Sequence, residues 1–179
     1  MTVTVEPREF KFVNFDAALI ERVARSMAEA IGIERPVRVE VDESTQLGRV
    51  EINIADTVTL RIQSGALEDS RRPRHQSEGA TSATIGRALL RVRDRLEGGF
   101  GEAPADDALS LRQAAAWDTY VAARLQRLGL PVNRQRYVYN FRNRHGFTDV
   151  ADGAFERIWN ADGLTWGELE SISTTGAAS

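Results

Sequence analysis

The sequence of 179 residues contains no cysteine, only two histidines and a single lysine, Lys11. Without cysteine the chain has no disulfide, no thiol nucleophile, no iron–sulfur cluster and no cysteine-based zinc site. Two histidines also exclude a centre built from three histidines. The sequence therefore predicts no metal site and no cofactor.

Long apolar runs are missing as well. No stretch approaches the roughly 20 apolar residues of a membrane-spanning helix, and residues 1–11 lack the apolar core of a signal peptide. The patterns HExxH, GxSxG, GxGxxG and GxxxxGK[ST] do not occur. The sequence therefore has none of the motifs that usually indicate a zinc peptidase, a serine hydrolase or a nucleotide-binding fold. These absences predict a soluble cytoplasmic protein with no membrane partner and favour a non-catalytic one.

The charges are divided unevenly along the chain. The net charge of −3 comes from 23 basic and 26 acidic residues, and 22 of the basic residues are arginine. Residues 1–69 carry a net −5, residues 70–145 a net +7, and residues 146–179 a net −5. Because guanidinium groups bind phosphate and carboxylate through two parallel hydrogen bonds, the basic middle predicts an anionic small molecule or an acidic protein surface as partner.

Hydrophobic periodicity predicts an α+β fold. Apolar residues at helical spacing predict a helix over 16–31, ended by Gly32. Strict alternation predicts strands near 37–42, 50–54 and 58–62, and a weaker pattern suggests one at 9–13. We expect a small, mostly antiparallel β-α-β-β-β sheet, although helix 16–31 also permits a parallel pairing of the first strand.

The second half of the chain is predicted to be helical. We expect a long loop over 64–80, a helix over 81–97 and an acidic linker over 100–109. Helices then follow, with residues 133–145 fitting either a helix or a strand. Ser110 with Gln113, and Thr165 with Glu168, have the spacing of capping boxes. The predicted divisions are 1–99, 110–175 (with one continuous domain as the alternative) and a frayed tail, 176–179.

The main candidate ligand site lies in the basic segment 70–78. Arg71, Arg72, Arg74 and His75 fall within five residues and precede a helix. The backbone N–H groups at a helix N-terminus would add to the arginines in binding an anion. The alternative is a solvated basic loop whose arginines pair with the acidic end segments.

A catalytic role is a second hypothesis for the same segment. His75 would act as general base, Glu78 would orient it, and Arg72 or Arg74 would hold an anionic substrate. A His-x-x-Glu pair is also compatible with a metal, but the flanking arginines oppose a cation. The hypothesis requires His75 and Glu78 to face one pocket.

Nucleic-acid binding is a third hypothesis. Arg87, Arg91 and Arg95 would form one line along helix 81–97, as expected for contact with a phosphate backbone. The segment 134–145 interleaves arginines with aromatic residues, a pattern typical of single-stranded nucleic-acid binding and equally of an amphipathic helix with an aromatic core face. Its candidate contacts are Arg136, Tyr139, Arg142 and Arg144.

Overall fold

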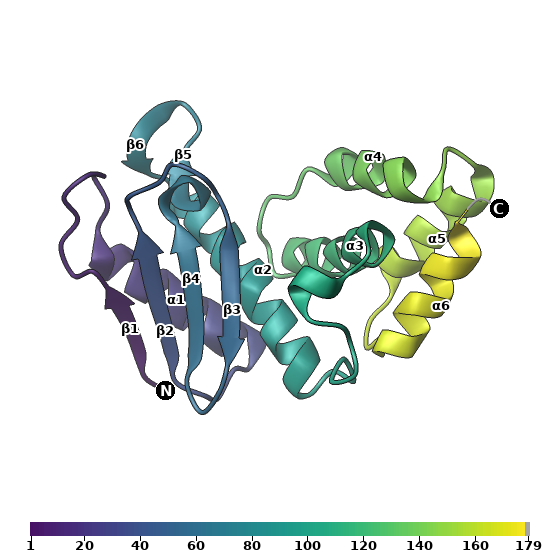
Figure 1. Ribbon diagram of the computed structural model, residues 1–179, viewed down its shortest axis with the longest axis horizontal. Helices are drawn as coiled ribbons and strands as arrows, with labels where there is room; N and C mark the ends of the chain where they lie inside the picture. The colour runs from purple at the N-terminus through teal and green to yellow at the C-terminus, as the bar shows by residue number, and fades with distance from the viewer. Residues whose placement is uncertain (178–179) are drawn as a thin grey trace. The chain divides into compact units, whose positions relative to one another are not determined.

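A computed structural model describes residues 1–177 of the protein and has the α+β fold that the sequence predicts. The chain forms two compact units, Met1–Arg93 and a second that starts at Asp94. The first unit holds the sheet, and the second is helical (Figure 1). The division lies within helix α2 (Glu78–Leu96), upstream of the segment 100–109 that separates the two predicted divisions.

The four-stranded sheet of the first unit is mixed, with the order β1-β2-β4-β3. Strands β1 and β4 both run parallel to β2, and β3 pairs antiparallel with β4. The pairing is therefore not mostly antiparallel, because the connection after β2 carries the chain past the position of β4 to the edge, and a hairpin then returns β4 beside β2. The elements are β1 (Val3–Glu6), α1 (Ala17–Ile31), β2 (Val37–Asp42), β3 (Val50–Ile54) and β4 (Val58–Gln63).

The first strand is Val3–Glu6, so the prediction of a strand at 9–13 is wrong. Only two valines alternate in β1, which is too short a pattern to stand out. Residues 9–13 belong to a loop because the backbone N–H groups of Lys11 and Phe12 donate to the Glu43 side chain at 2.7–3.1 Å and not to a neighbouring strand.

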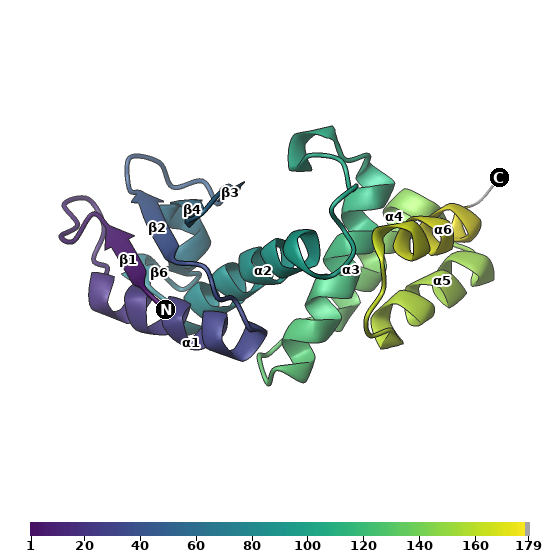
Figure 2. The same ribbon diagram turned by 90° about the horizontal axis from the view of Figure 1, so that it is seen from below.

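Helix α1 forms as predicted and covers one face of the sheet (Figure 2). Asp16 caps its first turn by accepting from the Ala18 N–H at 2.8 Å. Gly32 ends it with φ 84°, a left-handed conformation that glycine adopts without steric cost. The buried residues of the helix are Ala17, Ile20, Val23, Ala24, Ala28 and Ile31.

The loop expected over 64–80 contains regular structure. A short 3₁₀ helix, η1 (Ser64–Leu67), leads into a hairpin of β5 (Glu68–Asp69) and β6 (Arg72–Gln76). Neither strand produces a hydrophobic period, because β5 has only two residues and β6 has no apolar side chain apart from Pro73. Helix α2 then begins at Glu78, earlier than the predicted start, with the Ser77 hydroxyl accepting from the Ala80 N–H at 3.1 Å.

The second unit consists of helices with clear caps. Both predicted capping boxes are present, Ser110 with Gln113 and Thr165 with Glu168. Residues 134–145 form a helix, so the helical alternative for this segment is confirmed. The elements after α2 are η2 (Asp106–Ala108), α3 (Leu111–Arg127), α4 (Arg134–His145), α5 (Asp149–Asn160) and α6 (Trp166–Gly176).

An aromatic cluster fills the core of this unit. Phe100 is fully buried, and its ring centre lies 5.0 Å from that of Trp117 and 5.8 Å from that of Trp166. The segment 100–109 is therefore anchored by its first residue and is not a free linker. Of the tail predicted to fray, Gly176 still belongs to α6, and residues 178–179 lie outside the described residues.

Candidate functional site

The predicted ligand-binding arginines lie on the β5–β6 hairpin, residues 68–76, which we call the arginine hairpin. Arg71, Arg72 and Arg74 are all exposed. Across residues 1–177, no ion pair or side-chain hydrogen bond engages any of these three guanidinium groups. The alternative in which they pair with acidic segments of their own chain therefore finds no support in the described structure.

The shape of the arginine hairpin comes from a tight turn and a bulge. Asp69 pairs with Arg72, and its carboxylate accepts from the Arg71 N–H at 2.9 Å, which fixes the turn. Glu68 pairs with Gln76, so three residues of β6 bulge out between the two pairs. Within this bulge Arg74 has φ 66°, the only positive value at a non-glycine residue in the described chain.

The strained bulge makes the contacts that hold the hairpin against the loop before α1. The Asn14 N–H donates to the carbonyl oxygen of Arg74 at 2.8 Å, and the Asn14 amide nitrogen lies 3.4 Å from Nδ1 of His75. The Gln76 side chain accepts from the Asp16 N–H at 2.9 Å. A left-handed conformation costs a non-glycine residue about 1–2 kcal/mol, so the contacts around Asn14 offset strain at the residue that carries one of the exposed arginines.

The candidate catalytic pair, His75 and Glu78, gains no support from the described residues. His75 lies on β6 with its ring directed to Asn14, and Glu78 is the exposed first residue of α2. No hydrogen bond or ion pair joins the two within residues 1–177. No group of three or more metal-ligating side chains in this part of the chain is arranged to hold a metal ion.

The arginine line predicted on α2 is only partly available for a partner. Arg95 donates to the carbonyl oxygens of Ala103 and Pro104 at 3.2 and 2.8 Å and forms an ion pair with Asp106 at 2.9 Å. Its guanidinium carbon also lies 4.9 Å from the Trp117 ring centre. Arg91 has a partner within the described structure as well, which leaves Arg87 as the unpaired member of the line.

Helix α4 likewise engages part of its predicted nucleic-acid surface internally. Arg142 binds the Asp152 carboxylate through two nitrogens at 2.8 and 2.9 Å, and Phe141 is buried. This ion pair raises the pKa of Arg142 and lowers that of Asp152. The remaining candidates on this helix, Arg136, Tyr139 and Arg144, are exposed.

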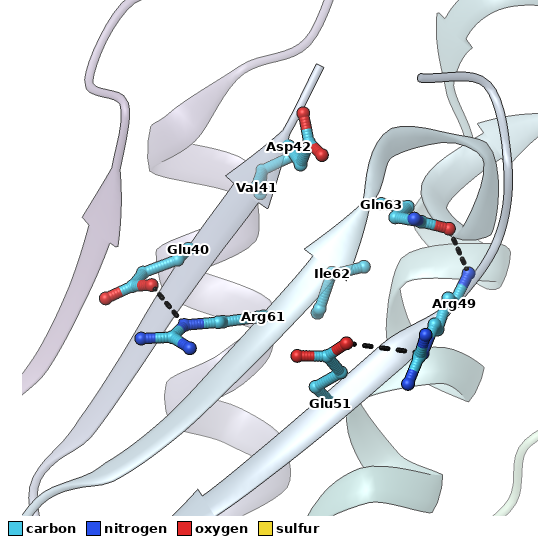
Figure 3. A pocket seen from close by; sticks show the side chains of 8 residues that line it. All are labelled: Glu40, Val41, Asp42, Arg49, Glu51, Arg61, Ile62 and Gln63. Atoms are coloured by element: carbon cyan, nitrogen blue, oxygen red, sulfur yellow. Dashed lines mark hydrogen bonds and ion pairs between the residues drawn. The ribbon is translucent and has the colours of Figure 1, made fainter. Parts of the chain in front are cut away.

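A cavity of about 340 Å³ that sequence reasoning missed lies on the exposed face of the sheet (Figure 3). Strand pairing aligns Glu40, Arg61 and Glu51 in one row across β2, β4 and β3, and Asp42 and Gln63 in the next. Ion pairs link Arg61 to Glu40 at 3.0 Å and Arg49 to Glu51 at 3.2 Å. The alternating pattern predicted this polar face, but cross-strand neighbours depend on an order of strands that alternation does not reveal.

The charges lining the cavity are largely satisfied by one another. Hydrogen bonds from the hydroxyl and the N–H of Ser44 lower the pKa of Asp42, which keeps this carboxylate ionised. The two arginines of the cavity each have a carboxylate partner, in contrast to those of the arginine hairpin. The cavity is therefore less suited than the hairpin to capture an external anion.

Comparisons with known proteins identify no relative. No protein-family model matches the chain, and neither a curated protein nor a solved structure matches it. None of the helices in residues 1–177 combines the length and the hydrophobicity that a membrane-spanning segment requires.

Proposed function

We propose that this protein is a non-catalytic binding protein whose arginine hairpin contacts an anionic ligand or an acidic partner. The observation that carries the proposal is the cluster of three exposed guanidinium groups at Arg71, Arg72 and Arg74, which have no ion pair within residues 1–177. Elsewhere many arginines bind carboxylates or carbonyl oxygens of the same chain, as Arg61, Arg95 and Arg124 do. Three neighbouring donors left unpaired on a short hairpin suit phosphate or carboxylate.

The architecture of the hairpin supports this assignment. Its turn is fixed by the Asp69 side chain, and its bulge is fixed by the bond from Asn14 to Arg74. The backbone that carries the arginines is therefore ordered before a ligand arrives, which lowers the entropic cost of binding. His75 lies beside the arginines on β6, with Nδ1 of its ring 3.4 Å from the Asn14 amide nitrogen.

The proposal is tested by titrating the full chain with inorganic tripolyphosphate in a calorimeter at low and moderate salt. Replacing Arg71, Arg72 and Arg74 by Gln is expected to weaken binding by about tenfold or more, because each exposed charged contact contributes up to about 1 kcal/mol. Affinity of the unaltered protein is expected to fall as salt rises, since exposed charges are screened.

A matched control removes the same charge elsewhere. Arg22, Arg38 and Arg157 are also exposed and without an ion pair in the described structure, and they lie on α1, β2 and α5. Replacing these three by Gln is expected to change the affinity by no more than about twofold. Equal losses in the two triple variants, or no binding by the unaltered protein, would refute the assignment to the hairpin.

A further inference from the structure

Three loop segments that are far apart in the sequence are joined at the end of the sheet where the parallel strands finish. We call them together the loop rim: residues 7–16, 43–49 and 64–76. The Phe12 N–H donates to the Glu43 carboxylate at 2.7 Å. The Asn14 N–H donates to the Arg74 carbonyl at 2.8 Å, and the Gly65 N–H donates to the Leu47 carbonyl at 3.0 Å. In Figure 1, loop 7–16 and the arginine hairpin extend beyond the ends of β1, β2 and β4.

The loop rim displays two large apolar side chains. Phe12 is 66% exposed and Leu47 is 68% exposed, and apart from Met1 they are the exposed large hydrophobic residues of the first unit. A single exposed apolar residue is ordinary. These two differ because both lie on loops at the same end of the unit as the unpaired arginines.

The backbone of both residues is firmly held. Glu43 binds the amides of Lys11 and Phe12, which fixes the first loop. A side chain at Gly65 would place its Cβ only 1.9 Å from the carbonyl oxygen of Gln46, so residues 46–47 pack directly on η1. Phe12 and Leu47 are thus presented to the outside by ordered backbone.

Cationic residues lie in the same loop rim as Phe12 and Leu47, and several carboxylates of the rim accept hydrogen bonds from backbone N–H groups. Lys11 is exposed next to Phe12, and the arginine hairpin supplies three more positive charges. In contrast, Asp16, Glu43 and Asp69 accept from backbone N–H groups of the fold itself. The rim therefore offers a partner two apolar side chains and four cations that form no ion pair within residues 1–177, with Glu9 as an exposed carboxylate among them.

We propose that the loop rim docks on an anionic lipid bilayer surface, with Phe12 and Leu47 entering the boundary between headgroups and acyl chains. In this arrangement Lys11 and the three hairpin arginines contact lipid phosphates. Apolar insertion combined with attraction to anionic lipids is the basis of interfacial binding. The inference rests on the proposed function, because it gives the same arginines a specific anionic partner.

The side-chain chemistry favours a bilayer over the alternatives. Single-stranded nucleic acid would stack its bases on aromatic rings, and Leu47 has none. A small anion would engage the hairpin arginines but would leave Phe12 and Leu47 exposed, whereas a bilayer surface engages both kinds of side chain. The sequence predicted no membrane partner because it lacks a spanning segment, an argument that concerns crossing a bilayer and not contact with its surface.

Vesicle sedimentation tests the inference on the full chain. Vesicles of phosphatidylcholine with about 30% phosphatidylglycerol are expected to bind the protein at least about tenfold more tightly than phosphatidylcholine alone, because each cation gains from an anionic surface. Replacing both Phe12 and Leu47 by Ser is expected to weaken vesicle binding by about tenfold or more, while tripolyphosphate binding stays unchanged.

The control variant replaces Leu111 and Phe147 by Ser, since these residues of the second unit are similarly exposed, at 62% and 65%. It is expected to bind vesicles as tightly as the unaltered protein.

Two outcomes would overturn the bilayer proposal while leaving the anion site intact. One is unchanged vesicle binding by the Phe12 and Leu47 variant, and the other is binding of the unaltered protein to tripolyphosphate but not to anionic vesicles. Tripolyphosphate binding that does not depend on Arg71, Arg72 and Arg74 overturns the proposed function itself. Binding of a single-stranded oligonucleotide that depends on Phe12, without vesicle binding, assigns the rim to nucleic acid and overturns the bilayer.

Discussion

Asp94 and Arg124 form a buried, bidentate ion pair in the second unit. Each carboxylate oxygen of Asp94 accepts from one terminal nitrogen of the guanidinium at 2.7 Å. The Trp117 ring N–H donates to the same carboxylate at 2.8 Å, so Asp94 joins α3 to the end of α2. Only 4% of the Asp94 side chain and 13% of the Arg124 side chain are exposed.

Replacing Asp94 by Asn is expected to lower the free energy of unfolding by about 3–5 kcal/mol, because it leaves the buried guanidinium of Arg124 without a counter-charge. Urea unfolding followed by tryptophan fluorescence measures this, since Trp117, Trp159 and Trp166 all lie in the second unit. The matched variant is Asp152→Asn, which breaks the more exposed pair with Arg142 and is expected to cost less than about 1 kcal/mol. Equal costs would show that burial does not strengthen the Asp94 pair.

Stability is also expected to depend on the protonation of His145. This residue is 1% exposed, with Nε2 at 2.8 Å from the Ser173 hydroxyl and Nδ1 at 3.1 Å from the Phe141 carbonyl. Burial lowers its pKa, with a smaller contribution from the positive charge of Arg112. Because the folded state then binds a proton less readily than the unfolded state, stability is full above the unfolded pKa of about 6.5 and falls as the pH drops below it.

Urea midpoints at pH 7.5 and pH 5.5 measure this loss, which cannot exceed about 1.4 kcal/mol for each pH unit. The carboxyl groups with lowered pKa, such as Asp152 and Glu168, lose their contribution only at lower pH. His145→Gln is expected to abolish the dependence, and His75→Gln, which removes the other histidine, is expected to retain it. A dependence that follows His75 would contradict this account.

The parts of the fold that the sequence predicted correctly depend on local signals. Helix 16–31 has an apolar stripe, and the capping boxes at Ser110 and Thr165 place the two partners three positions apart. By contrast, Glu43 fixes Phe12 from 31 positions away, and Asn14 binds Arg74 from 60 positions away. Neither pair leaves a periodic trace, so the sequence predicts a strand at 9–13 and an irregular loop over 64–80 in place of the observed loop and hairpin.

The candidate site shows the same contrast between local and long-range features. The sequence located the cluster of Arg71, Arg72 and Arg74, because adjacency is a local property. Whether an arginine is available is not local: Arg95 looked equivalent to Arg87 by helical spacing, yet it is occupied by Asp106 and two carbonyl groups beyond the end of α2. The sequence alone therefore locates the charged residues, but only the structure shows which arginines are already bound within the chain.

The α4 surface is expected to contribute little to nucleic-acid binding. Arg142 is bound to Asp152, and Phe141 lies in the core, so the exposed contacts reduce to Arg136, Tyr139 and Arg144. In fluorescence titrations of a single-stranded oligonucleotide at low salt, replacing Arg136 and Arg144 by Gln is expected to change affinity by less than about threefold, since only two phosphate contacts are removed. A larger loss, together with a steep salt dependence, would restore α4 as a nucleic-acid surface.

Arg74 is expected to show opposite effects on stability and on binding. Its φ of 66° suits glycine, so Arg74→Gly is expected to raise the free energy of unfolding by about 0.5–1 kcal/mol, after allowing for the greater backbone entropy of glycine in the unfolded chain. The same variant removes one of three guanidinium donors and is expected to weaken tripolyphosphate binding severalfold. Urea unfolding and calorimetry measure the two effects. Arg72→Gly, at a strand position with ordinary φ, is expected to weaken binding without the gain in stability. If Arg74→Gly binds tripolyphosphate as tightly as the unaltered protein, the strained residue has no part in anion binding, and the bulge serves only to hold loop 7–16.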